Sequence, residues 1–266
     1  MKTSRLAAVP AALLVVVAIW EIVATARYAT AVPGDVAWAR AAAIVRTGYR
    51  PGDLIVFAPA WADPIGRLHL GDLIPLEIAG RMDSARYGRI WQLSIRDAIA
   101  PEVAGLAAVE DRAIDGVTVR RYERAPAVVV ADLGDAIATA RTEGGSARVE
   151  LVEVAFEPHR CVVVAAPGGR PVRVTFPNLA LGSGLVGYVG IADVFTRRDS
   201  REPVTLEVEI AGAGVASVTA PIDTWTRFHA ATTPGVADVA FVVRWAADRG
   251  RSSQPKQICL AAEARR

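Results

Sequence analysis

The pattern of apolar and polar positions divides the chain into three stretches. The first is an apolar run from Leu6 to Ala26. The second, over residues 32–146, alternates short continuous apolar runs with helical patterns. The third, over residues 147–266, consists of short apolar segments separated by glycine, proline and polar residues. This division predicts a targeting segment over 1–31, a small α/β domain and a β-sandwich domain, in that order.

The N-terminal run predicts export of the remainder of the chain. Lys2 and Arg5 precede the run, as basic residues precede a signal peptide or an anchor with its C-terminal side outside. At about 1.5 Å per residue, Leu6–Ala26 is long enough to span a bilayer. Glu21 shortens the uninterrupted part to the length of a signal peptide. Anchor and cleaved signal both stay open, beside the alternative of a buried core helix, and both place the bulk of the chain in the cell envelope or outside the cell.

The second stretch predicts alternating strands and helices. Leu54–Ala58 is a continuous apolar run of the kind found in strands covered on both faces, and Arg89–Ile95 predicts the next strand. Further strands are expected over 117–122 and 128–131, and helices over 36–47, 73–81, 101–109 and 132–142. This alternation predicts a Rossmann-like domain with a mostly parallel sheet.

The third stretch predicts an all-β domain. In Val204–Ile210 polar and apolar residues alternate strictly, which is typical of a half-buried strand. Similar short segments occur at 161–165, 172–176, 185–191, 226–229, 239–245 and 258–262. Their number and spacing favour a β-sandwich or jelly roll.

Charge and cysteine content narrow the possible functions. The net charge of +2 and the absence of a basic block exclude a nucleic-acid-binding role. The two cysteines, Cys161 and Cys259, lie in an early and in the last predicted strand. An exported chain meets oxidising conditions, so we predict a disulfide between them, with two free buried thiols as the alternative. Two cysteines cannot fill a zinc site, and no metal is predicted.

The densest polar cluster follows the first strand and consists of Trp61, Asp63, Arg67, His69 and Asp72. In open α/β sheets ligands bind beyond the carboxyl ends of the strands, where this cluster begins. Its imidazole and two carboxylates, Asp63, His69 and Asp72, are candidate catalytic groups or metal ligands. Alternatively, Asp72 caps the next helix.

Two further residues extend this candidate site. Trp91 lies in the second strand and Arg96 directly follows it, so these two join Trp61 and Arg67 as candidate ligand-binding residues. Dinucleotide, Walker A and Gly-x-Ser-x-Gly motifs are all missing, and no cofactor is predicted. Exposed aromatic residues of the β domain, such as Trp225 and Tyr188, offer rings on which a sugar can stack.

The first half of the chain resembles the extracytoplasmic tail of bacterial GT-C membrane glycosyltransferases, the dolichyl-phosphate-mannose–protein mannosyltransferase-like family. The resemblance lies in Pro51-Gly52-Asp53-Leu54-Ile55-Val56 and in Arg89-Ile90-Trp91. It implies a membrane helix followed by a small α/β unit. The active site of that family lies in a multi-helix membrane domain, so no catalytic residue is carried over.

The second half, from Cys161 to Cys259, is similar in its strand pattern to galactose-binding-like jelly rolls. The loop Gly190-Ile191-Ala192-Asp193 is part of this resemblance. It implies a sandwich fold and a possible sugar ligand.

Three hypotheses of function follow. The first is a non-catalytic envelope protein that binds a glycan, a lipid-linked sugar or a protein partner, and that assists membrane glycosyl transfer. The second is an extracytoplasmic hydrolase or transferase that uses Asp63, His69 and Asp72. The third is a purely structural envelope protein.

Overall fold

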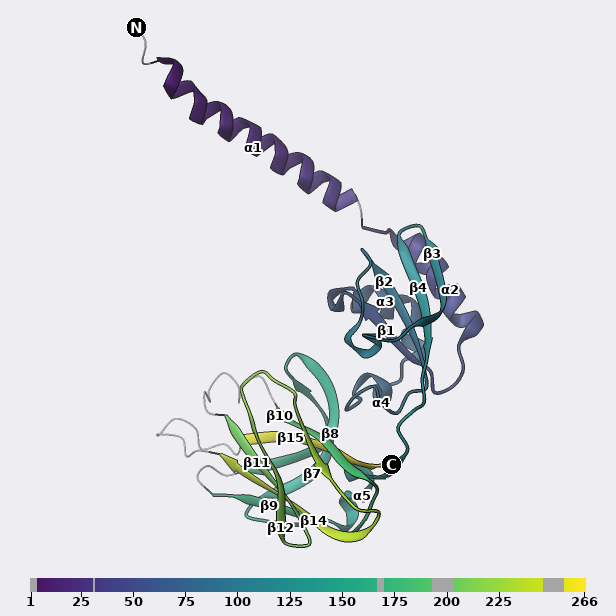
Figure 1. Ribbon diagram of the computed structural model, residues 1–266, viewed down its shortest axis with the longest axis vertical. Helices are drawn as coiled ribbons and strands as arrows, with labels where there is room; N and C mark the ends of the chain where they lie inside the picture. The colour runs from purple at the N-terminus through teal and green to yellow at the C-terminus, as the bar shows by residue number, and fades with distance from the viewer. Residues whose placement is uncertain (1–3, 31, 167–169, 193–202, 246–255) are drawn as a thin grey trace. The chain divides into compact units, whose positions relative to one another are not determined.

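The computed structural model describes residues 4–30, 32–166, 170–192, 203–245 and 256–266 (Figure 1). The chain divides into two compact units. The first unit consists of Met1–Ile74 and Arg89–Arg124, and the second unit consists of Pro75–Gly88 and Ala125–Arg266. The boundary lies at Arg124 rather than at residue 146, because strands between these positions pair with the second unit. Lys2, before the N-terminal apolar run, and Asp193, in the Gly190–Asp193 loop, lie outside the described residues.

The N-terminal segment is helical. Helix α1 spans Ser4–Thr30 and includes the predicted apolar run Leu6–Ala26. Its apolar side chains, such as Leu14 and Trp20, are exposed. We predicted a spanning anchor or a signal peptide here; among the helices that the structure describes, none is long and apolar enough to cross a membrane.

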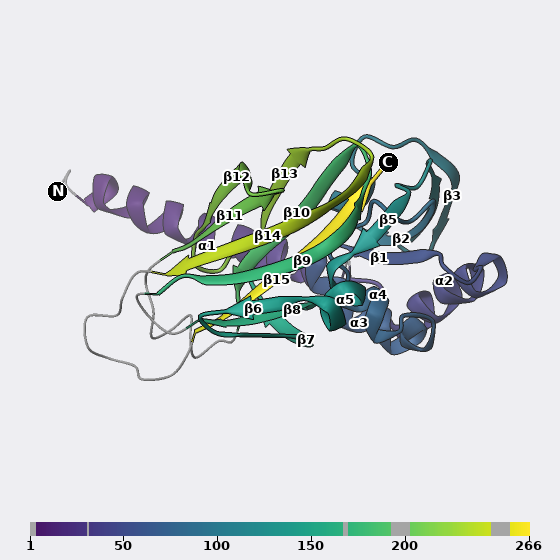
Figure 2. The same ribbon diagram turned by 90° about the horizontal axis from the view of Figure 1, so that it is seen from below.

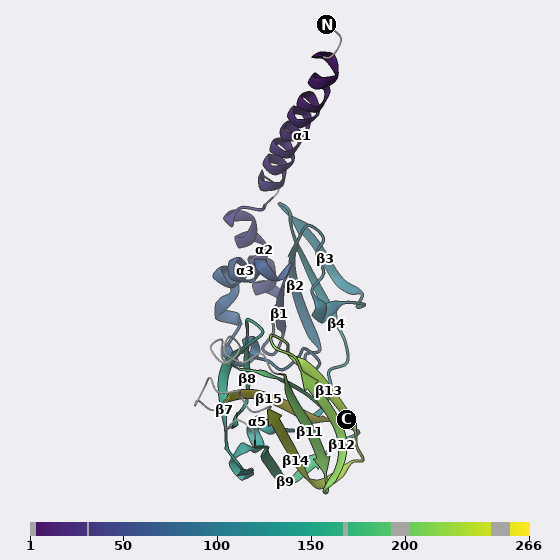
Figure 3. The ribbon, with the colours of Figure 1, turned by 90° about the vertical axis from the view of Figure 1, so that its left-hand side faces the viewer.

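The first unit is built on a four-stranded sheet of order β1-β2-β4-β3. Figure 3 shows helices α2 and α3 on one face of this sheet. The elements of the unit after α1 are α2 (Asp35–Gly48), β1 (Leu54–Ala58), η1 (Ala60–Ala62), α3 (Asp63–Leu70), η2 (Gly71–Leu73), β2 (Arg89–Ile95), η3 (Pro101–Val103), β3 (Ala108–Ile114) and β4 (Val117–Glu123).

The sheet is mixed rather than mostly parallel, so the predicted Rossmann-like domain is not shown. Strands β1 and β2 are parallel and almost entirely buried, as their apolar runs predicted. Strand β4 pairs with β2 and β3 in the antiparallel sense. The β3–β4 hairpin turns at Asp115 and Gly116, whose φ angles of 48° and 88° fit the type I′ turn that the twist of a hairpin favours.

Three predicted helices are wrong in extent. The segment 101–109 forms only the short η3 before β3 begins at Ala108. The segment 73–81 forms only the one-turn α4 (Leu76–Ala79). The segment 132–142 is divided among β5 (Val129–Asp132), α5 (Leu133–Ala136), η4 (Ile137–Thr139) and β6 (Arg141–Glu143). Pairing of β5 with β15 and of β6 with β9 outweighs the local helical pattern.

The second unit is a β-sandwich whose eight strands β8 to β15 are connected as a jelly roll (Figure 2). Their pairing is nested: β8 pairs with β15, β9 with β14, β10 with β13, and β11 with β12. Two Greek keys wound in this way are the jelly-roll topology, which confirms the predicted fold of this half. The strands are β7 (Ser146–Val154), β8 (Glu157–Ala166), β9 (Val172–Leu181), β10 (Gly184–Ile191), β11 (Val204–Ile210), β12 (Ala213–Ala220), β13 (Thr226–Ala231), β14 (Gly235–Trp245) and β15 (Lys256–Arg265).

The core of the sandwich lies between a sheet of order β13-β10-β15-β8-β7, which β5 joins beside β15, and a sheet of order β12-β11-β14-β9-β6. Strand β11 alternates as predicted, with Val204, Leu206 and Val208 fully buried. Phe176 and Phe241 meet edge to face at 5.9 Å in this core. The predicted disulfide is confirmed: Cys161 and Cys259 are bonded, and their Cα atoms lie 5.6 Å apart.

Candidate functional site

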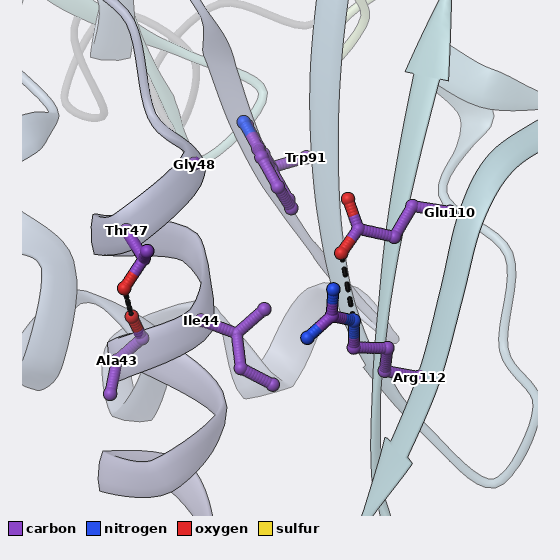
Figure 4. Close-up of a pocket in the computed structure, with 7 residues that line it drawn as sticks. All are labelled: Ala43, Ile44, Thr47, Gly48, Trp91, Glu110 and Arg112. Carbon is purple, nitrogen blue, oxygen red and sulfur yellow. Dashed lines mark hydrogen bonds and ion pairs between the residues drawn. The ribbon is translucent and has the colours of Figure 1, made fainter.

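The first unit contains a pocket between α2 and the sheet (Figure 4). Its volume of about 380 Å³ lies within the range of small-ligand sites. It is lined by Ala43, Ile44, Thr47, Gly48, Trp91, Glu110 and Arg112. The predicted ligand-binding residue Trp91 is thus part of it.

Trp91 is fixed beneath the C-terminal end of α2. The residue is 1% exposed, and a Cβ on Gly48 would lie 2.7 Å from its ring, so only glycine permits this approach. The indole Nε1 donates a hydrogen bond of 2.9 Å to Asp53, and the guanidinium of Arg121 lies 5.7 Å from the ring centre. Trp91 is therefore a rigid and almost fully buried part of the pocket lining.

Asp53 is the residue that holds this arrangement together, and the sequence analysis missed it. Its carboxylate is buried and also accepts a 3.0 Å hydrogen bond from the Arg50 N–H, which closes the Pro51-Gly52 turn. Arg89 forms an ion pair with this carboxylate, and its Nη1 lies 3.3 Å from the Asp53 Oδ2 atom. The two atoms do not meet the geometry of a hydrogen bond. Arg89 also donates to the carbonyl of Gly48 at the end of α2. The sequence feature that could have predicted its structural role is the position of this aspartate directly after a Pro-Gly turn.

The rim of the pocket is polar. Arg112 and Glu110 on edge strand β3 form an ion pair at 2.8 Å, and Arg121 contacts the same carboxylate at 3.3 Å. The Arg112 side chain is 60% exposed and so accessible to a ligand. Ile44 points from α2 into the space facing Arg112 (Figure 4). The pocket can accept a ligand with one apolar face and several hydrogen-bonding groups.

The structure brings two of the predicted ligand-binding residues together outside the pocket. Trp61 in η1 and Arg96 after β2 follow the carboxyl ends of the parallel strands, as predicted. The Arg96 guanidinium lies 5.8 Å from the ring centre of Trp61, which is 53% exposed. Arg67, by contrast, pairs with Asp63 one helical turn earlier, at 2.5 Å.

The three candidate catalytic groups each have a partner of their own. Asp63 binds Arg67, Asp72 binds Arg46 at 2.6 Å, and His69 Nε2 lies 3.0 Å from Asp35 without hydrogen-bond geometry. The hydrogen bond from Arg46 lowers the pKa of Asp72. The catalytic interpretation stays a prediction that these pairings do not favour. Among the described residues, no group of three or more His, Cys, Asp or Glu could hold a metal ion.

In the second unit, three aromatic rings stack over the outer face of the sheet that contains β8 and β15. Trp225 lies between His159, at 4.3 Å, and Tyr188, at 5.6 Å. His159 is 5% exposed, its Nδ1 lies 3.1 Å from the carbonyl of Arg81, and its Nε2 has no hydrogen-bond partner. Burial lowers the pKa of His159 to about 4. The ring is therefore neutral at physiological pH.

Residues 75–88, here called the covering segment, lie over this face. Carbonyls of three successive residues accept hydrogen bonds from the jelly roll: Gly80 from the Arg160 N–H, Arg81 from His159, and Met82 from the Trp225 indole. Met82 packs against the apolar cluster around the disulfide. The segment is therefore bound to the jelly roll through its backbone carbonyls.

Buried charges secure the other end of the covering segment. Arg86 contacts Asp132 and the 3%-exposed Glu263, while Arg265 binds both Glu263 and Asp83. Burial alone would lower the pKa of Arg86, but Glu263 and Asp132 outweigh it and raise the pKa. A cavity of about 90 Å³ lies among these side chains. Of the charged residues that line this cavity, Arg86, Asp132 and Glu263 are paired in this way.

Comparisons with known proteins relate the chain to carbohydrate-binding modules at low similarity. No family model and no curated protein matches the sequence. The CBM51-2 and INT domains of Clostridium perfringens ZmpB, in a complex with GlcNAc, are 18% identical with a TM-score of 0.38; the match covers 57% of this chain and 35% of that one. The chain thus spans about a third of that structure.

Two single modules are similar to a comparable extent. The C-terminal CBM6 of LamC from Zobellia galactanivorans is 12% identical over 48% of this chain and 94% of its own, with a TM-score of 0.31. CBM6cm-2 of Cellvibrio mixtus lichenase 5A, in complex with cellotriose, is 14% identical over 52% and 98%, with a TM-score of 0.32. These likenesses transfer neither a ligand nor a site, and the jelly-roll assignment rests on the strand pairing.

Proposed function

We propose that this chain is a non-catalytic protein of the cell envelope that binds a glycan, and that the pocket of the first unit takes one sugar residue. The observation that carries the proposal is the composition of the pocket. Ile44 supplies apolar surface for the C–H groups of a sugar ring, in a pocket whose lining includes the almost fully buried Trp91. Glu110 and Arg112 supply an acceptor and several donors for its hydroxyl groups.

The location in the envelope is part of this proposal. The disulfide between Cys161 and Cys259 supports it, since such bonds persist in oxidising compartments. A lipid-linked sugar or an envelope polymer would both present single sugar residues to the pocket. An accessory role beside a membrane glycosyltransferase is the form of this function that the sequence resemblance implies.

Blocking the pocket tests the proposal. Full-length protein is screened against envelope glycans, and the affinity for the best ligand is measured by calorimetry for the wild type, Ile44→Trp and Val36→Trp. The first substitution fills the pocket, whereas Val36 is 64% exposed on the same helix and does not line it. We expect Ile44→Trp to lower the affinity at least about tenfold, or roughly 1.4 kcal/mol, and Val36→Trp to leave it unchanged.

Two results would count against the pocket. One is the absence of binding to any glycan by wild-type protein. The other is an Ile44→Trp variant that keeps its thermal stability and binds as the wild type does.

A further inference from the structure

Strand β7 is the outermost strand of the sheet β13-β10-β15-β8-β7 (Figure 3). Within the described part of the chain it pairs on one side only, with β8, and its nine residues do so without a register shift. Other outer strands differ, since the pairings of β3 and β12 contain register shifts and β6 has three residues. Bulges, short length and proline protect sheet edges from association, and β7 has none of the three.

The outer edge of β7 carries backbone groups that β8 does not use. The hairpin that joins the two strands turns at Ala155 and Phe156, whose φ angles are 53° and 69°. The pair that flanks such a two-residue turn is hydrogen-bonded, and so is every second pair after it. The N–H and C=O groups of Ala147, Val149 and Leu151 therefore point away from β8. No hydrogen bond from another described residue reaches these outward groups.

The charges of β7 are complementary to those of a second β7. Arg148 donates to Glu150 at 2.5 Å, and the two side chains are 47% and 37% exposed. When two antiparallel strands pair, opposite charges that face each other stabilise the pairing and like charges destabilise it. If two copies pair about a twofold axis at Val149, Arg148 of each copy faces Glu150 of the other. With residue 148 or 150 on the axis, two guanidinium groups or two carboxylates meet, and with residue 151 on the axis neither charge meets a partner.

We propose that this chain forms a dimer in which β7 pairs antiparallel with β7 of a second copy, with Val149 on the twofold axis. The two Arg148 and two Glu150 side chains then alternate in sign around the axis. Glu153, the remaining charge of β7, faces the uncharged Gly145 of the second copy in this register. The inference does not rest on glycan binding, because the pocket lies in the other unit.

Backbone and apolar groups support the same alignment. The outward groups of Val149 in the two copies face each other, and those of Ala147 face those of Leu151, so donors meet acceptors throughout. The Leu151 side chain, which is 44% exposed, loses contact with water beside Ala147 of the second copy, and this burial favours association. The sheets of the two copies become one sheet, which covers the edge that each leaves open.

The test exchanges the charges. Dimerisation of full-length protein is measured by sedimentation equilibrium in a mild detergent, because α1 exposes apolar side chains. We expect the wild type to dimerise, and Arg148→Glu and Glu150→Arg each to raise the dissociation constant at least about tenfold, since each places four like charges around the axis. An equimolar mixture of the two variants should dimerise again, because an acidic pair then faces a basic pair. Glu207→Arg, which breaks an ion pair with Arg244 in the other sheet of the sandwich, is the control and should leave the constant unchanged.

Crosslinking tests the register. Val149→Cys places two thiols on the axis, with Cα atoms about 5.5 Å apart, which a disulfide can bridge. Two Leu151→Cys residues would lie four residues apart along the strands. On mild oxidation we expect covalent dimers of the first variant and not of the second. A monomeric wild type, charge variants that dimerise as tightly as the wild type, a mixture that does not recover dimerisation, or preferential crosslinking of Leu151→Cys would each overturn the proposal.

Discussion

His159 makes the jelly-roll unit sensitive to acid in a calculable way. The ordinary pKa of 6.5 is lowered to about 4 in the folded chain, chiefly by burial. In the unfolded chain the ring takes up its proton as the pH falls through 6.5, whereas in the folded chain it does so only near pH 4. The unfolded state thus binds more protons within this window, and stability falls as the pH is lowered through it.

The magnitude follows from the size of the shift. Each pH unit between the two pKa values corresponds to about 1.4 kcal/mol, so the folded state loses about 3 kcal/mol between pH 6.5 and 4. Below pH 4 the ring is protonated in both states and the loss stops. Because whole domains are stable by only about 5–15 kcal/mol, this loss is measurable.

His159→Asn is the matched variant. Its amide can still donate to the Arg81 carbonyl, but it does not titrate, and the carboxylates contribute equally to both proteins. Urea unfolding from pH 7.5 to 4 should show the wild type losing about 3 kcal/mol more than the variant. The chain has three histidines, so NMR can follow His159 directly. A His159 resonance that titrates near pH 6.5, or a wild-type–variant difference that is independent of pH, would refute the reasoning.

Two further substitutions probe covalent and buried polar contacts. The disulfide closes a loop with a sequence separation of 98, so Cys161→Ala with Cys259→Ala should lower the free energy of unfolding by up to roughly 4–5 kcal/mol in urea titrations. A loss under about 1 kcal/mol, or free thiols in protein isolated from its own cells, would contradict this. Asp53→Ala removes the acceptor of the Trp91 indole N–H and the ion-pair partner of Arg89, so it should cost about 3 kcal/mol and abolish binding in the pocket. Asp111→Ala, which breaks the ion pair with Arg120, is the control and should lower the free energy of unfolding by less than about 1 kcal/mol in the same urea titrations. Equal losses of stability in Asp53→Ala and Asp111→Ala would contradict the role assigned to Asp53.

The elements that the sequence predicted best are those whose pattern records burial directly. The apolar run Leu54–Ala58 and the alternating run Val204–Ile210 became strands with the expected exposure. The wrong helix over 132–142 lies where pairing with distant strands decides the structure. Residues 141–143 join the sheet because β9 offers them an edge, which no local pattern reveals. The Asp-Gly dipeptide at 115–116 is a sequence signal for the antiparallel β3–β4 hairpin, and the prediction of a mostly parallel sheet did not use it.

The candidate site residues were predictable only where their positions follow from the order of the strands along the chain. Trp61 and Arg96 follow strands that run parallel, so their proximity follows from the position of ligand sites in such sheets. Glu110 and Arg112 were missed because their place beside Trp91 depends on strand register: Trp91 lies opposite Arg121, which lies opposite Glu110. Register between distant strands is set by packing and cannot be read from spacing alone.

The nested pairing of the jelly roll also has a consequence for how the unit assembles. Strands β11 and β12 meet through a tight connection, whereas β8 finds β15 only after about a hundred intervening residues are available. Closing a long loop costs more entropy than closing a short one, and topologies rich in distant contacts fold slowly. Loop-closure entropy therefore favours assembly from the inside outward. Each completed pair shortens the effective loop of the next, and the disulfide locks the outermost pair once β15 lies between β8 and β10.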